Sequence, residues 1–225
     1  MTAVILQARI DSSRLPGKAL LPLGGEPAVL RVMQALNHVP ADMRVLACTE
    51  DSLLEFKPLA HNASFEIFAG LKYDVLERFC QVIRKYSITR VIRATGDNPF
   101  VFTDAASSIN IEAQSFNADY AGYLELPYGA GVESADASAL LRASSESALP
   151  FDREHVCTYL YNNPELFKIH RPLAPSRWNN PDIRLTIDTQ EDYDRAALLY
   201  SALTKEEQRY SGDTIIKKYK EIFQL

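Results

Sequence analysis

The sequence contains few cysteines, and their spacing excludes two common roles. Cys48, Cys80 and Cys157 are the only three in 225 residues, and they lie far apart. Such a set provides neither a disulfide framework nor the closely paired ligands of a zinc site. Cys48 and Cys80 lie among apolar residues. We therefore expect the cysteines to be buried structural residues.

An excess of positive charge is also missing, because the formal net charge is −5. Non-specific binding of nucleic acid needs a basic field that neutralises phosphates. The composition therefore predicts no nucleic-acid partner. It also means that the three cations near the N-terminus, Arg9, Arg14 and Lys18, indicate a local pocket rather than a basic surface.

Long apolar runs are absent, since none approaches the roughly 18 residues that a membrane-spanning helix needs. No stretch typical of a signal peptide precedes the first apolar segment. We therefore expect no membrane association and a cytoplasmic location. The sequence also lacks the G-x-G-x-x-G fingerprint, which argues against a dinucleotide-binding fold.

Apolar strand-like segments and amphipathic helical segments alternate over residues 1–123. With 47% hydrophobic residues in 225, the chain can form one domain with a substantial core. This alternation predicts a three-layer α/β/α fold with a mostly parallel sheet. The predicted strands are 3–6, 44–48, 64–68, 90–94 and 119–123, and the predicted helices are 27–36, 53–61, 74–86 and 103–114.

The regular alternation ends near Leu124. Prolines and glycines become frequent, and residues 124–181 are interpreted as a small irregular α+β lobe. We expect the loop around Trp178 to be exposed. The other predicted elements are helices 136–147 and 152–162 (capped by Asp152), an antiparallel strand 168–171, a strand 183–187, a helix from 188 to about 203 and a last helix capped by Asp213.

The loop that follows the first strand carries Arg9, Arg14 and Lys18, with a Pro16-Gly17 turn. Such a turn lets backbone N–H groups approach a ligand. Cations and hydroxyls at the carboxyl end of a first parallel strand are typical of an anion pocket, here for a polyphosphate. The alternative from charge alone is a solvated basic loop.

Two aspartates follow predicted buried strands, Asp97 in Gly96-Asp97-Asn98-Pro99 and Asp188 in Ile187-Asp188-Thr189. The carboxyl ends of parallel strands face one crevice. Each aspartate could instead be a turn former or helix cap, and Asp188 with Glu191 has the form of a capping box.

The order of residues in the first loop carries a resemblance. Gln7-Ala8-Arg9, then Ser13-Arg14-Leu15-Pro16-Gly17-Lys18, followed by Leu20, Leu23, Gly25 and Pro27, resembles the signature of the sugar cytidylyltransferases. The similarity is greatest to the branch named for spore-coat polysaccharide biosynthesis protein F. The resemblance follows the chain as far as about Leu203, and only the C-terminal helix lies outside it. It implies a nucleotide-diphospho-sugar transferase-like fold.

The resemblance implies transfer of CMP from CTP to a sugar acceptor in surface polysaccharide biosynthesis, with release of pyrophosphate. The implied cofactor is Mg²⁺, bound by Asp97 and Asp188. Arg9 and Lys18 join these aspartates as catalytic residues. The nucleotide-binding residues implied are Ala8, Arg9, Ser13, Arg14, Gly17, Lys18, Thr95 and Asp97, and the sugar-binding residues implied are Glu133, Arg153, His155 and Arg184.

The resemblance also suggests a division of the single domain. Residues 1–123 would bind the nucleotide, 124–181 would bind the acceptor and form a homodimer, and 182–225 would return to the core. From the residues alone, His155 could equally be a cap or core histidine, and Arg184 could serve in an ion pair.

Two positions depart from the family pattern. Gly131 stands where the branch carries an aspartate, and Thr95 stands where the keto-sugar synthetases carry a base-reading glutamine. The alternative enzyme is a glycosyltransferase with a D-x-D motif, but Asp192-Tyr193-Asp194 falls in a predicted helix, where positions i and i+2 do not face one ligand. A non-catalytic sugar-nucleotide binding protein is the remaining alternative.

Overall fold

The computed structural model describes residues 1–224, apart from the side chains of residues 206 and 207. In this part of the chain a seven-stranded sheet has the order β5-β4-β1-β6-β8-β7-β9. Its neighbours pair in parallel, except that β8 runs antiparallel to β6 and β7. The strands are β1 (Thr2–Ala8), β4 (Met43–Thr49), β5 (Glu66–Gly70), β6 (Arg90–Thr95), β7 (Tyr120–Ala121), β8 (Glu133–Asp136) and β9 (Ile169–His170), while β2 (Pro22–Leu23) and β3 (Glu26–Pro27) form a separate antiparallel pair.

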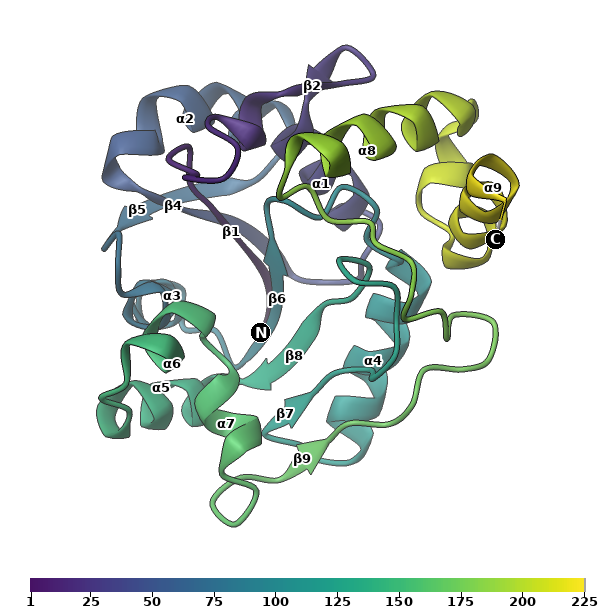
Figure 1. The fold of residues 1–225 in the computed structure, drawn as a ribbon. Helices are drawn as coiled ribbons and strands as arrows, with labels where there is room; N and C mark the ends of the chain where they lie inside the picture. The colour runs from purple at the N-terminus through teal and green to yellow at the C-terminus, as the bar shows by residue number, and fades with distance from the viewer. Residues whose placement is uncertain (225) are drawn as a thin grey trace.

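The helices cover both faces of this sheet, as expected for a mostly parallel sheet (Figure 1). The structure therefore has the predicted three-layer α/β/α architecture. The α-helices are α1 (Ala28–Leu36), α2 (Leu53–Asn62), α3 (Val75–Tyr86), α4 (Thr103–Ser115), α5 (Ala137–Glu146), α6 (Pro150–His155), α7 (Thr158–Asn162), α8 (Gln190–Ala202) and α9 (Gly212–Phe223). Short 3-10 turns lie at η1 (Lys18–Leu20), η2 (Glu50–Ser52) and η3 (Glu206–Arg209).

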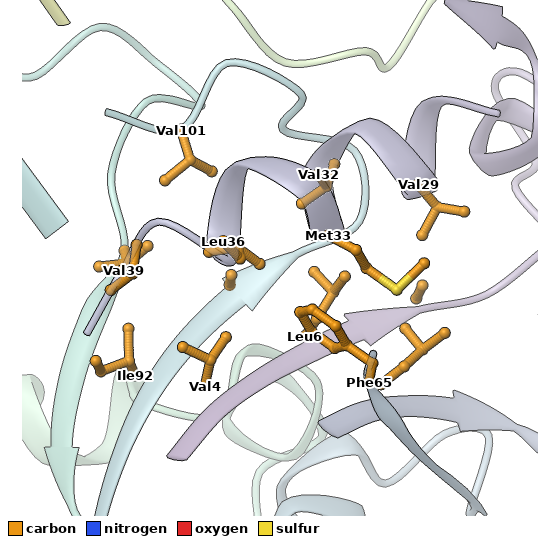
Figure 2. Close-up of a cluster of buried hydrophobic side chains, with 14 of the residues drawn as sticks. Val4, Leu6, Val29, Val32, Met33, Leu36, Val39, Phe65, Ile92 and Val101 are labelled. Atoms are coloured by element: carbon orange, nitrogen blue, oxygen red, sulfur yellow. The ribbon is translucent and has the colours of Figure 1, made fainter. Parts of the chain in front are cut away.

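Strand β1 shows why the sheet is buried on both faces. Successive side chains of a strand point to opposite faces. Val4 and Leu6 pack under α1 with Met33, as Figure 2 shows, whereas Ala3 and Ile5 belong to the cluster beneath α3. All of these side chains are buried. From Ala3 to Leu6 the central strand is thus apolar in every position, and the polar loop follows after Ala8.

The segment 124–181 is continuous with the main sheet. It supplies β8 and β9, and helices α5 and α7 share the apolar cluster beneath α3. Strand β9 pairs with β7 in parallel, so the predicted antiparallel strand was wrong in direction. The predicted helix 152–162 is two helices, because Val156 has φ +65° and interrupts the helical backbone.

Three further expectations were wrong for reasons of tertiary packing. Asp152 does not cap a helix: it is buried and accepts hydrogen bonds from Ser147 and Thr158. Trp178 is buried against Phe102 and α9 rather than exposed. The last helix has Ser211 at its N-cap, with Asp213 in its first turn.

Residues 183–187 are extended but do not form a strand of the sheet. Their backbone bonds to two loops: Leu185 N–H donates to Tyr128 at 2.8 Å, and Ile187 N–H donates to the carbonyl of Asp97 at 2.8 Å. The alternating apolar side chains are buried beside α8 and α9. This segment therefore fastens the start of α8 to the end of β6. In the described part of the chain, no helix combines the length and apolarity needed to cross a membrane.

Candidate active site

A cavity of about 640 Å³ opens at the carboxyl ends of β1 and β6. This is where the first loop and the two aspartates were expected to meet. The sequence-predicted residues that line it are Ala8, Arg9, Ser13, Arg14, Lys18, Thr95, Asp97, His155 and Asp188. The structure therefore brings together segments that are up to 180 positions apart in the chain.

The loop between β1 and η1 is held by its own backbone. The N–H groups of Ser12 and Gly17 both donate to the carbonyl of Ile10, at 2.9 and 3.3 Å. Gly17 has φ +68° and ψ 15°, a left-handed conformation in which glycine is favoured. The chain reverses here and η1 begins at Lys18. Gly17 itself is not part of the cavity wall; it sets the direction of Lys18.

Lys18 joins the two aspartates. Its Nζ lies 2.7 Å from Asp97 Oδ2 and 2.8 Å from Asp188 Oδ1. The side chains of Lys18 and Asp188 are 14% and 7% exposed, so these contacts are shielded from bulk water. Two carboxylates that touch one ammonium group are close enough to share a single cation.

Close packing of two strand ends sets the position of Asp97. Its neighbour Gly96 donates its N–H to the carbonyl of Gln7 at 2.8 Å. A Cβ at Gly96 would lie 2.8 Å from Cβ of Ala8, which is closer than side-chain atoms pack. Only glycine therefore allows β6 to end this close to β1, with Asp97 directed into the cavity.

The charge of Asp97 is maintained by its partners. Burial opposes ionisation of this carboxyl, but the attraction and hydrogen bond of Lys18, with a hydrogen bond from Thr95, hold its pKa below the usual value. Thr95 Oγ1 donates to Asp97 Oδ1 at 2.6 Å. Thr95 thus lines the cavity with its hydroxyl already engaged by a carboxylate.

Asp188 is surrounded by cations. Arg14 Nη2 donates to Oδ1 at 3.0 Å, and Arg184 Nη2 donates to Oδ2 at 2.9 Å, in addition to the contact from Lys18. Asp188 does not form the predicted capping box. Thr189 is the N-cap of α8, and it exchanges hydrogen bonds with Asp192. The carboxylate of Asp188 is therefore free of a capping role.

The sugar-side predictions divide into two groups. His155 lines the cavity, whereas Glu133, Arg153 and Arg184 do not belong to its lining. Arg153 donates to Asp74 at 3.0 Å and to the carbonyl of Ser144.

Glu133 pairs with Arg93 and accepts from Tyr120 at 2.9 Å. Arg93 lines the cavity and also donates to Gln7. Glu133 thus supports the cavity wall from behind.

Sequence reasoning missed two cavity arginines, Arg78 and Arg93. Arg78 is 2% exposed, and its Nε has no hydrogen-bond partner in the described part of the chain, while Nη1 donates to the carbonyl of Leu71 at 2.6 Å. Burial lowers its pKa. A charged residue on the apolar face of a predicted helix, as Arg78 is in α3, was the available signal.

The carboxylates of Asp97 and Asp188 fit a divalent cation by their chemistry. Hard oxygen ligands suit Mg²⁺, which usually takes one or two carboxylates together with substrate phosphate oxygens and water. Within residues 1–224 no group of three or more His, Cys, Asp or Glu side chains forms a ready metal site. A metal here would therefore complete its coordination with oxygens of water or of a substrate.

Comparison with known proteins gives this geometry a family. A sequence model described as Cytidylyltransferase matches residues 3–221. The chain belongs to the cytidylyltransferase family. The match reaches further than the resemblance predicted, because it includes most of α9. Spore coat polysaccharide biosynthesis protein SpsF of Bacillus subtilis (strain 168) is 38% identical over 208 residues, covering 87% of this chain and 85% of that protein.

One solved structure agrees with the cytidylyltransferase assignment, and a second shares the fold. A cytidylyltransferase from Leptospira borgpetersenii superposes with a TM-score of 0.89 at 25% identity, over 99% of this chain and 95% of that one. CMP:2-keto-3-deoxy-manno-octonic acid synthetase complexed with CTP superposes with a TM-score of 0.69 at 15% identity, over 89% and 98% of the two chains. At that identity the second comparison shows a shared fold alone.

Proposed function

We propose that this cytidylyltransferase uses Mg²⁺ to transfer CMP from CTP to a hydroxyl of a sugar, releasing pyrophosphate. The contact of Lys18 with both Asp97 and Asp188 is the observation that carries the proposal. It joins the family's basic loop to a half-buried and a buried carboxylate in one cavity. The relationship to SpsF supports a place in surface polysaccharide biosynthesis.

The basic loop would bind the triphosphate. Arg9, Arg14 and Lys18 line one cavity with Ser13, so they can neutralise the phosphate oxygens and hold the leaving pyrophosphate in line with the attack. Catalysis of phosphoryl transfer depends mainly on such positioning and charge stabilisation. Arg14 is 66% exposed, which leaves its side chain free to turn from Asp188 toward a phosphate.

Asp97 and Asp188 would hold the metal. A bound Mg²⁺ supplies Lewis-acid stabilisation of the phosphoryl oxygens and lowers the pKa of the attacking hydroxyl. The protein directs both carboxylates into the cavity, and the partners of Asp97 keep that carboxylate ionised. Thr95 orients Asp97, and Arg184 orients Asp188.

Thr95 would contribute little to reading the base, because its hydroxyl donates to Asp97. Arg78 is a buried donor on the cavity wall with an unused N–H at Nε. An oxygen of the nucleotide would satisfy it, because a buried donor without a partner is costly. CTP is proposed as the substrate on the ground of family membership.

The acceptor sugar would contact His155, which lines the cavity from α6. Arg153 and Glu133 would act indirectly. Arg153 ties α6 to the cap of α3 through Asp74, and Glu133 holds Arg93 in the cavity wall. We assign both to positioning the acceptor side, in place of the direct sugar contacts that the sequence predicted.

A homodimer would form through residues 124–181. This segment exposes several large apolar side chains, namely Leu149 65%, Phe151 60%, Leu166 39% and Leu173 62%, and burying them between two copies would be favourable. Light scattering during size-exclusion chromatography tests this assembly, with a mass near 25 kDa contradicting it.

The test of the activity is pyrophosphate release from CTP, UTP, ATP and GTP, each with a panel of sugars and keto-sugar acids, in the presence of Mg²⁺. We expect release with CTP and one acceptor, and loss of release on chelation with EDTA. Asp188→Asn is the inactive control. Release of nucleotide from a preformed CMP-sugar, without pyrophosphate formation, would instead indicate a glycosyltransferase.

A further inference from the structure

The two proposed metal ligands are already bridged by a residue of the protein. Lys18 Nζ contacts Asp97 Oδ2 at 2.7 Å and Asp188 Oδ1 at 2.8 Å. An ammonium group that donates to both carboxylates occupies the space in which one cation would touch both. The same oxygens cannot hold Lys18 in this position and a metal as well.

We propose that Lys18 blocks the metal site in the absence of nucleotide. Its ammonium group stays on the two aspartates until the phosphates of a triphosphate attract it. A divalent cation therefore binds only together with the nucleotide. This inference rests on the proposed function, because it takes Asp97 and Asp188 as the metal ligands. It assigns to Lys18 a role in the order of binding, in addition to its contact with phosphate.

The charges around the two aspartates support this blocking role of Lys18. Asp188 receives hydrogen bonds from Arg14 and Arg184 as well as from Lys18. The negative charge of the pair is thus already compensated inside the protein. A free divalent cation would have to displace Lys18 and would leave its ammonium group without a counter-ion in a shielded site.

A triphosphate removes this obstacle. Lys18 lines the same cavity as Arg9 and Ser13, and the lysine side chain is a flexible four-carbon stem with a compact charge. Phosphate oxygens in the cavity would receive Lys18 and would also supply the ligands that two aspartates lack. By linkage, the nucleotide and the cation then raise each other's affinity by the same factor.

The test uses Mn²⁺ as an EPR-visible probe, titrated into the full-length protein without nucleotide. We expect weak binding by the wild type, and binding at least tenfold tighter by Lys18→Met, which keeps a long unbranched side chain and removes the charge. The double variant Lys18→Met/Asp97→Asn should lose the gain, which locates the new binding at the aspartates. Lys85→Met changes the net charge equally on the exposed side of α3 and should match the wild type.

Lys18→Gln repeats the measurement with a polar side chain, and thermal melting verifies that each variant is folded. The proposal is overturned if both Lys18 variants bind free Mn²⁺ no more tightly than the wild type. It is also overturned if the gain persists when Asp97 is replaced. These titrations need no acceptor. Failure to find pyrophosphate release would count against the proposed function, whereas the Mn²⁺ affinities alone decide the blocking role of Lys18.

Discussion

Arg184 makes two hydrogen bonds to Asp192, from Nε to Oδ1 at 2.8 Å and from Nη2 to Oδ2 at 3.1 Å. Burial opposes ionisation of Asp192, yet the hydrogen bond from Arg184 holds its pKa below the usual value. Asp192 also accepts the backbone N–H of Asp188 at 3.1 Å. Arg184 and Asp192 together fix Asp188, because Asp192 accepts its backbone N–H and Arg184 donates to its Oδ2. The other oxygen, Oδ1, faces Lys18.

We therefore expect Arg184→Met and Asp192→Asn to lower kcat with little change in KM for the acceptor. A residue that touched the sugar would show the opposite pattern. Loss of Arg184 leaves the buried Asp192 with only the longer ion pair to Arg195 at 3.5 Å. Because Arg184 is 36% exposed, we expect a stability loss of about 1–2 kcal/mol, less than for a fully buried pair. The double variant should be no slower than the slower single variant, since the two act as one unit. Asp194→Asn, exposed on the same helix, is the control.

Asp97→Asn and Asp188→Asn should fold normally and lose metal-dependent turnover by more than about 100-fold, because an amide keeps the shape but not the anion that Mg²⁺ prefers. Steady-state pyrophosphate release at several Mg²⁺ concentrations measures the loss. Asp182→Asn, in an exposed loop, should retain wild-type activity. Turnover at the wild-type rate in either active-site variant would remove that residue from the proposed metal site.

The side chain of Thr95 indicates how strongly the enzyme selects CTP over UTP. Its short hydroxyl already donates to Asp97 and cannot present the paired donor and acceptor of an amide to a pyrimidine edge. We expect the wild type to prefer CTP over UTP only moderately. Thr95→Gln should raise the ratio of the two kcat/KM values by about tenfold, the effect of roughly one hydrogen bond. Rejection of UTP by many orders of magnitude in the wild type would show that other groups read the base.

The cysteines should be unreactive in the native protein. All three are buried, and burial raises the pKa of the Cys48 and Cys80 thiols to about 11. Since the thiolate is the reactive form, we expect no reaction with Ellman's reagent at pH 8 over minutes. Three thiols per chain should react in guanidinium chloride. Fast modification of a native thiol would contradict the packing described for the core.

Glu112 gives a pH dependence of stability. Burial opposes its ionisation, but hydrogen bonds from Tyr123 and His170 lower its pKa below the usual 4.5. A lowered folded-state pKa contributes stability above about pH 4.5, and this is lost as the pH falls through the folded value. The difference in unfolding free energy between wild type and Glu112→Gln should be about 1 kcal/mol at pH 7 and smaller at pH 3.

Urea titrations at both pH values measure this difference. Glu165→Gln, on an exposed loop, serves as the control and should show a small difference at either pH. A difference for Glu112→Gln that grows toward low pH would contradict the assigned direction.

Much of the fold follows from local patterns. Asp74 lies three residues before Glu77, a local spacing typical of a helix start, and the Glu77 N–H donates to its side chain at 2.9 Å. The strands β1, β4 and β6 were predicted from short apolar runs that a sheet covered on both faces requires. Strand β8 was missed, because Glu133–Asp136 is short and polar at both ends, and its strand character depends on pairing with β6.

The sequence by itself determined the architecture of the parallel half of the sheet, the basic loop and the residues that meet at its edge, because strand and turn signals are local and the motif is long. Only the tertiary structure decided what those side chains do to one another. Lys18 bridges Asp97 and Asp188, Thr95 binds Asp97, and Arg184 binds Asp188 and Asp192. Each of these contacts depends on the separation of charged atoms from different segments, and a separation of a few ångströms across the fold has no local signature in the chain.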